Sequence, residues 1–181
     1  VENLRKETKI PLAFLVYFNC VFKYGFERFL NPCRDIGIDG LIIPDLPLEE
    51  RKGLQEMMRN YAIDLIPLVA PTSGERMKDI VADASGFVYC VSSIGVTGKR
   101  DEFQTDLKAF INQVKKYTDI PAALGFGISS PEMIRKIKGI CDGMIVGSAI
   151  IEKIEEGLVD HTSKDKVFNF VKKLAEAKNN A

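Results

Sequence analysis

Two glycine-rich segments of the sequence could hold a phosphate group. Gly125 and Gly127 stand just ahead of a helix start, and Gly147 and Ser148 precede the short apolar segment 149–156. Glycine leaves backbone N–H groups accessible, and a helix start supplies unpaired donors and the positive end of the helix dipole. The pattern therefore predicts a phosphate site, although the same glycines could serve only to allow tight turns.

A longer glycine-rich loop, "SSIGVTGKR", follows an apolar run and ends in two cations. Gly95 and Gly98 allow sharp bends, and Thr97 places a hydroxyl between them. Long loops with glycine hinges are candidate lids, and Gly98 could add a further N–H group to the phosphate site. The alternative for this segment is a solvated surface loop.

Three aromatic residues lie at or near the ends of apolar runs: Tyr17, Tyr89 and Phe126. Each could line a pocket for a flat apolar ligand, and for each one taken singly ordinary core packing is the competing interpretation. Asp45 lies between two prolines after another run. It could be a catalytic acid, a helix cap or an interface residue, and the spacing favours the cap.

These residues need a repeated scaffold to position them. Six short, nearly continuous apolar runs, typical of strands buried on both faces of a parallel sheet, lie at 11–17, 40–44, 64–70, 86–92, 121–127 and 143–149. Amphipathic segments of helical length lie between and after them, at 22–36, 48–60, 75–83, 105–117, 131–139, 149–156 and 163–178. Ser130 and Pro131 are typical of an N-cap and a first helical position.

The order is β-α repeated six times, which predicts parallel strands with helices on the outside. A doubly wound open sheet and a (β/α) barrel both fit. The count of six favours the open sheet. Glycine-rich ends in the last two units, with a short extra helix after the last strand, favour the barrel, whose phosphate sites commonly lie there.

Composition excludes several classes of function. The chain of 181 residues has a formal net charge of zero, which gives no electrostatic footprint for nucleic acid or an acidic membrane. Four scattered cysteines and a single histidine, His161, predict a reducing, cytoplasmic compartment with no disulfide framework and no metal site. No apolar run approaches the ~18–20 residues of a membrane span.

The segments "YFN", "GIDGLIIPDLPLEE", "SSIGVTG", "GFGIS" and "IVGSAII", in this order and spacing, resemble the α subunit of tryptophan synthase. The resemblance covers about residues 9 to 156. It implies a TIM (β/α)8 barrel and a lyase of tryptophan biosynthesis. The implied reaction is retro-aldol cleavage of indole-3-glycerol phosphate to indole and glyceraldehyde 3-phosphate, with no cofactor and no metal.

The resemblance also implies roles for individual residues. Backbone groups of Gly98, Gly127, Gly147 and Ser148 would hold the phosphate, and Thr97 would latch the lid onto a catalytic aspartate. Tyr17, Tyr89 and Phe126 would line the substrate pocket. In an α2β2 heterotetramer, Asn19 and the region of Pro47 would face the β subunit, although Cys20 stands where the family usually has proline.

The family's two catalytic carboxylates are expected upstream of the matched region, so we identify no catalytic residue in this chain. We expect residues 1–181 to form one partial barrel of six βα units with the first two missing, and residues 1–8 to end the missing second helix. Such a chain alone would be inactive, and its open sheet edges would favour association. Two alternatives are another phosphate-binding barrel enzyme of amino-acid biosynthesis and a non-catalytic binding module.

Overall fold

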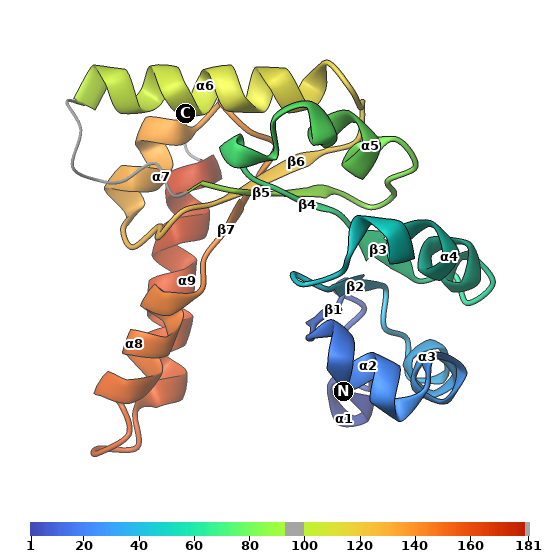
Figure 1. Ribbon diagram of the computed structural model, residues 1–181. Coiled ribbons are helices and arrows are strands. Elements are labelled where there is room, and N and C mark those ends of the chain that lie inside the picture. Colours follow the sequence, from blue (N-terminus) through green and yellow to red (C-terminus); the bar gives the residue numbers. More distant parts are fainter. Residues whose placement is uncertain (93–99, 180–181) are drawn as a thin grey trace.

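The computed structural model describes residues 1–92 and 100–179, with the side chains of 100–105 left aside. The chain forms parallel strands with helices along the outside of an arc (Figure 1). The strands are β1 (Ala13–Leu15), β2 (Gly40–Ile42), β3 (Asp64–Ile66), β4 (Leu68–Val69), β5 (Val88–Val91), β6 (Ala122–Gly125) and β7 (Gly143–Ile145).

The strands pair in the order of the sequence, as β1-β2-β3 and β4-β5-β6-β7. A doubly wound sheet reverses its strand order at a switch point, whereas a barrel adds each strand beside the one before it. The consecutive order therefore excludes the open doubly wound alternative, and the fold is a partial TIM barrel. Within the described part of the chain, β1 and β7 are each paired on one side only.

Pro67 divides the third apolar run into β3 and β4. Proline has no N–H group to give to a ladder, and its carbonyl accepts the backbone N–H of Tyr89 at 2.8 Å. β3 pairs with β2, whereas β4 pairs with β5. One run thus joins the two sheets, and the seven strand segments amount to the six βα units that the sequence predicts.

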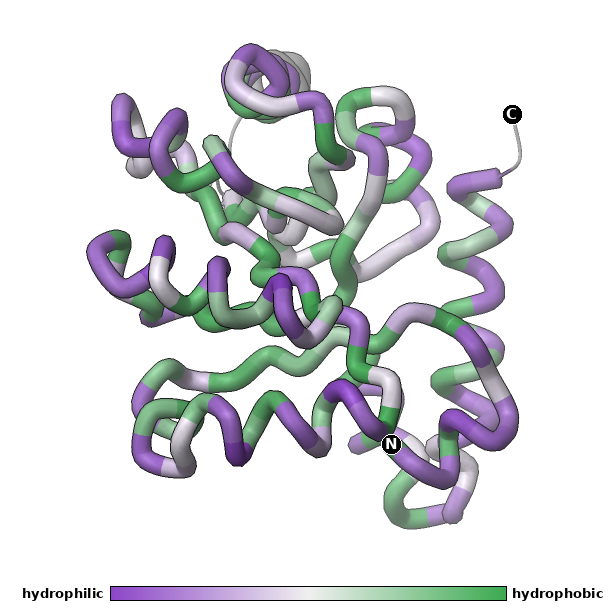
Figure 2. The backbone as a smooth tube through the Cα atoms, turned by 90° about the vertical axis from the view of Figure 1, so that its right-hand side faces the viewer, coloured by the Kyte–Doolittle hydropathy of each residue, from purple (hydrophilic) through white to green (hydrophobic). Residues whose placement is uncertain are grey.

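The helices cover one face of the sheets. They are α1 (Glu2–Arg5), α2 (Phe18–Tyr24), α3 (Phe26–Asp35), α4 (Leu48–Arg59), the 3-10 turn η1 (Pro71–Arg76), α5 (Met77–Val81), α6 (Arg100–Lys115), α7 (Pro131–Ile137), α8 (Ser148–Glu156) and α9 (Ser163–Asn179). Apolar and polar residues alternate along most of them, as expected for helices with one buried stripe (Figure 2).

Two predicted helices differ from the structure. The segment 22–36 is two helices, because Gly25 has a φ of 94°, which no helical residue adopts, and α2 ends there before α3 begins. The segment 75–83 contains only α5, preceded by η1 with Gly74 at a φ of 52°. Both breaks depend on left-handed glycine conformations that the hydrophobic pattern does not reveal.

Most of the buried side chains form two cores, both on the helix side of the sheets. One contains Leu41 and Leu65 together with residues of α3 and α4. The other contains Val88 and Leu124 together with residues of α6, α7 and α9. Side chains alternate along a strand, so the strand residues that alternate with the core residues face the inside of the arc. Leu15 of β1 is one of them and is 57% exposed.

Asp39 joins β1 to β2 at their amino ends. Its backbone N–H donates to the Leu12 carbonyl at 2.8 Å, and its carboxylate accepts the Leu12 N–H at 2.7 Å. Arg5 of α1 lies 2.5 Å from the same carboxylate oxygen and also donates to the carbonyl of Gly37. The amino-terminal segment is thereby attached to the first two strands.

Asp142 repeats this arrangement between β6 and β7. Its backbone N–H donates to the Ala122 carbonyl at 3.0 Å, and its carboxylate accepts the Ala122 N–H at 2.7 Å. Lys115 of α6 pairs with that carboxylate at 2.5 Å. Both aspartates precede a glycine that begins a strand, so the two positions share a local sequence pattern as well as a geometry.

Candidate phosphate and substrate site

The last two strand ends bring the predicted phosphate residues to one edge of the sheet. Gly125 of β6 pairs with Ile145 of β7, and both strands run in parallel. Gly127 and Gly147 each follow two residues later, at the same level beyond the sheet. Gly127 has a φ of 69°, and a side chain at either glycine would meet no atom of the residues that the structure describes within 4 Å. Both backbones therefore border open space.

The first turn of α8 presents backbone donors at this edge. Gly147 is the N-cap residue, no side chain of the described residues caps the helix, and the Gly147 carbonyl accepts the N–H of Ile150 at 2.8 Å. The N–H groups at the start of a helix have no acceptor within the helix. An anion beside Gly147 and Ser148 would be hydrogen-bonded by them and favoured by the helix dipole.

The neighbouring helix α7 begins differently. The Ser130 hydroxyl caps it by accepting the N–H of Met133 at 3.3 Å, and Pro131 occupies the first position, as predicted. Glu132 follows in the first turn, where hydrogen bonds from its own backbone N–H and from Ser130 lower the pKa of its carboxyl group. Because this helix start already has a cap and an ionised carboxylate, α8 is the better anion site.

Tyr89 and Gly125 pack against each other from adjacent strands. A Cβ at Gly125 would lie 2.7 Å from Cε2 of Tyr89 and 3.0 Å from its hydroxyl oxygen. Burial raises the pKa of the Tyr89 phenol, so the ring is neutral at physiological pH. Tyr89 lies on the face of β5 away from the helix-side core, which is where a residue lining the mouth of a barrel must be.

The other predicted pocket residues lie in different surroundings. Phe126 is 8% exposed and belongs to the helix-side core, so most of its surface serves packing. Tyr17 follows β1 at the other end of the arc and is 63% exposed. Thr97 and Gly98, with the rest of the predicted lid, lie outside the described residues. Gly127, Gly147 and Ser148 thus follow two neighbouring strands, and the Tyr89 ring reaches Gly125, the last residue of one of them.

Asp45 is a helix cap, although for a different helix from the one its spacing indicates. Pro47, and no side chain, occupies the N-cap of α4. The Asp45 carboxylate instead accepts the backbone N–H of Phe18, the first residue of α2, at 2.8 Å. No local signal could have indicated this bond, because its partners are 27 residues apart and meet only when β1 and β2 pair.

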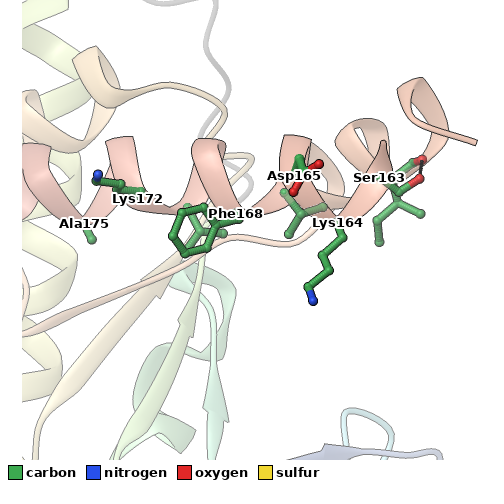
Figure 3. A pocket seen from close by; sticks show the side chains of 9 residues that line it. Ser163, Lys164, Asp165, Phe168, Lys172 and Ala175 are labelled. Atoms are coloured by element: carbon green, nitrogen blue, oxygen red, sulfur yellow. Dashed lines mark hydrogen bonds between the residues drawn. The ribbon is translucent and has the colours of Figure 1, made fainter. Parts of the chain in front are cut away.

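A hollow lies on the helices, away from the strand ends. A space of about 640 Å³ lies along α8 and α9 and is lined by side chains such as Ile154, Phe168 and Val171 (Figure 3). Phe168 is 65% exposed there, and Ser163 at the rim donates a hydrogen bond to the Ile154 carbonyl at 2.7 Å. Of the predicted site residues that the structure describes, none lines this hollow.

The described residues provide neither of two further kinds of site. No group of three or more histidine, cysteine, aspartate or glutamate residues among them could hold a metal ion. None of the helices described is both long enough and apolar enough to cross a membrane.

Comparison with known proteins decides which family this arrangement represents. The family model "Tryptophan synthase alpha chain" matches residues 1–180. The chain belongs to the tryptophan synthase alpha chain family. The alpha chain of Alkaliphilus metalliredigens is 64% identical over 179 residues, which are 99% of this chain and 67% of that one. The alpha chain of Thermoanaerobacter sp. strain X514 is 52% identical over 176 residues, 97% of this chain and 67% of that one.

Solved structures agree with these relatives. The tryptophan synthase subunit alpha of Campylobacter jejuni is 34% identical, with a TM-score of 0.79 over 92% of this chain and 69% of that one. The subunit of Legionella pneumophila strain Paris is 29% identical and superposes with a TM-score of 0.88 over 99% of this chain and 67% of that one. The chain thus spans about two thirds of the length of its relatives.

Membership of this family confirms the predicted fold and reaction class. Tryptophan synthase alpha chains are lyases that cleave indole-3-glycerol phosphate in tryptophan biosynthesis. The alternative of another phosphate-binding barrel enzyme of amino-acid biosynthesis is therefore set aside. The individual site residues remain predictions, which the geometry above makes specific.

Proposed function

We propose that this chain carries the phosphate anchor and part of the indole pocket for cleavage of indole-3-glycerol phosphate. The observation that carries the proposal is the uncapped start of α8, with Gly147 and Ser148 beside Gly127 at the ends of two strands in register. Gly98 would add a donor from the loop, and Thr97 would hold that loop closed.

The pocket would hold the indole ring against aromatic side chains. Tyr89 presents a neutral phenol on the inside of the arc, Tyr17 would lie at the rim, and Phe126, which is 8% exposed and packed in the helix-side core, would contribute little of its surface. Anchoring the phosphate at one end would fix the reacting carbon–carbon bond relative to the protein, which is how binding energy assists a reaction. The general acid and base would be carboxylates outside the set of residues named here, so the chain alone would bind substrate without turning it over.

We further propose that the chain acts in the cytoplasm with a tryptophan synthase β subunit. The related chains of Pyrococcus furiosus were solved in a tryptophan synthase complex, described for one structure as a2b2. Asn19 in the first turn of α2 and Pro47 before α4 are both exposed and would contact that subunit.

A negative charge introduced at the start of α8 tests the phosphate anchor. Gly147→Asp places a carboxylate at the helix start without a clash, since no atom lies within 4 Å of the added Cβ. We expect at least about tenfold weaker binding of indole-3-glycerol phosphate in calorimetry, because the carboxylate would repel the phosphate and offset the favourable helix dipole.

Gly53→Asp is the matched control. Gly53 of α4 also has nothing within 4 Å of an added Cβ and receives the same change of charge, yet it lies outside the predicted site. The Gly53→Asp variant should bind indole-3-glycerol phosphate with the affinity of the wild type. Equal affinities for the Gly147→Asp variant and the wild type would refute the anchor.

A further inference from the structure

Two hydrogen bonds hold the backbone on either side of Tyr17. Before it, the N–H of Val16 donates to the Ile42 carbonyl at 3.0 Å as the last bond between the β1 and β2 segments. After it, the N–H of Phe18 donates to the Asp45 carboxylate at 2.8 Å. The carboxylate therefore takes the place of the next backbone acceptor and extends the strand pairing past the point where the ladder ends.

The loop that carries Asp45 is itself constrained. Pro44 and Pro47 flank it with fixed φ angles. The N–H of Leu46 donates to the Ile43 carbonyl at 3.2 Å, directly around Asp45. A carboxylate on such a loop has a defined position, so it can orient the group that it binds.

The Tyr17 side chain has little else to hold it. It is 63% exposed, and it belongs to neither of the two buried cores. Tyr17 is also the N-cap residue of α2 and supplies no side-chain cap to that helix. The bonds to Ile42 and Asp45 therefore fix the backbone from which the Tyr17 side chain projects.

We propose that Asp45 is a positioning residue that acts through Tyr17. By capping α2 from the neighbouring strand end, it fixes where the chain leaves β1 and so how the phenol lies at the rim of the pocket. A carboxylate at this position also interacts favourably with the positive end of the α2 dipole. This inference rests on the proposed function, because Tyr17 matters here as a residue of the substrate pocket.

The test compares substrate affinity in five variants of the chain, of which Tyr17→Ala alone serves as the background for the double variant. Asp45→Ala removes the acceptor, whereas Asp45→Asn keeps an oxygen in its place. Asp35→Ala is the matched control, because Asp35 is also exposed and its described contact is only with the adjacent Arg34. The fourth variant combines Asp45→Ala with Tyr17→Ala, measured beside Tyr17→Ala alone, since residues that act as a unit are not additive.

We expect Asp45→Ala to weaken binding of indole-3-glycerol phosphate about five- to tenfold, as loss of a helix cap predicts. Asp45→Asn should recover most of that loss, and Asp35→Ala should bind as the wild type does. In the Tyr17→Ala background, Asp45→Ala should have no further effect. Hydrogen exchange at the Phe18 amide should accelerate in Asp45→Ala and much less in Asp45→Asn.

Wild-type affinity in Asp45→Ala, or a full additional loss in the Tyr17→Ala background, would overturn the proposal while leaving the phosphate anchor intact. Failure of the wild-type chain to bind the substrate would instead refute the proposed function, and this role of Asp45 with it. An unchanged Phe18 exchange rate in Asp45→Ala would show that the bond does not hold α2 in solution.

Discussion

Gly125 and Tyr89 show how a single missing side chain shapes the site. The Tyr89 ring occupies the space where a Cβ at position 125 would lie, at 2.7 Å from Cε2. Both residues are on paired strands, so the Tyr89 ring can move aside only by turning about its own side-chain torsions. The glycine thereby sets the position of the ring that we propose as one wall of the pocket.

Gly125→Ala should therefore destabilise the protein. The added methyl group must displace the Tyr89 ring or the strand, and overpacking of this kind costs about 1–3 kcal/mol. Urea unfolding measures the change, and the same substitution in a Tyr89→Ala background should cost much less, because the obstructing ring is gone.

Gly53→Ala is the comparison for this prediction. That helical glycine has no neighbour within 4 Å of an added Cβ, so alanine should stabilise the protein by up to ~1 kcal/mol through helix propensity alone. Equal effects at positions 53 and 125 would contradict the close approach of Tyr89.

Sequence reasoning located several of these residues and misjudged others. The glycine pairs and the Ser130 cap depend on local spacing, so they could be predicted. The role of Gly125 as a neighbour of Tyr89 could not, because their contact depends on the register between β5 and β6. Asp45 does not cap α4, the helix that its spacing indicates. It accepts the Phe18 N–H at the start of α2, a contact that could not be identified before β1 and β2 were paired.

At the scale of elements, the Asp142 arrangement ties α6 to the sheet. Its hydrogen bonds with Lys115 and with the Ala122 N–H lower the pKa of the Asp142 carboxyl group. A group whose folded pKa is depressed contributes stability above its unfolded pKa and loses it as the pH falls through the folded value. The contribution should thus be complete at neutral pH and decline below about pH 4.

Asp142→Asn tests this pH dependence. The amide oxygen can still accept the Ala122 N–H, so the variant mainly removes the charge. Because the carboxylate is 48% exposed, we expect a loss of only about 0.5–1 kcal/mol at pH 7. The difference from the wild type in urea midpoint should shrink as the pH falls below about 4. A difference independent of pH would show that the charge is not what matters.

The limits of the predicted helices have local causes. The hydrophobic pattern placed one helix at 22–36, yet Gly25 at a φ of 94° separates α2 from α3. The pattern likewise showed one strand at 64–70, whereas Pro67 interrupts its ladder and changes its partner. In both cases the hydrophobic periodicity continues across a residue whose backbone cannot continue the helix or the strand ladder. The number of βα units was therefore predicted correctly, whereas the limits of these elements were not.

At the scale of the whole molecule, the two buried cores share no residue. The first draws on residues 30 to 65 and the second on residues 69 to 177, with Pro67 between them. Strands pair only with their neighbours in the sequence. Such an arrangement allows one part to open while the other remains folded.

Hydrogen exchange at increasing urea should reveal two opening free energies, with the lower one for the smaller first core. Leu41→Ala and Leu124→Ala form a matched pair, because both leucines are fully buried in strands and each change should cost about 2–5 kcal/mol. Leu41→Ala should accelerate hydrogen exchange mainly in the part of the molecule around the first core, and Leu124→Ala mainly in the part around the second core. A uniform acceleration across both parts in either variant would show that the molecule unfolds as one cooperative unit.

The position of Pro67 also bears on how the protein is made. Every buried residue of the first core precedes it in the chain. During synthesis at ~5–20 residues per second, that core can be complete on the order of ten seconds before the last helix of the second core emerges. The nascent chain would then present the first core as a folded unit, on whose last strand the following units assemble one after another.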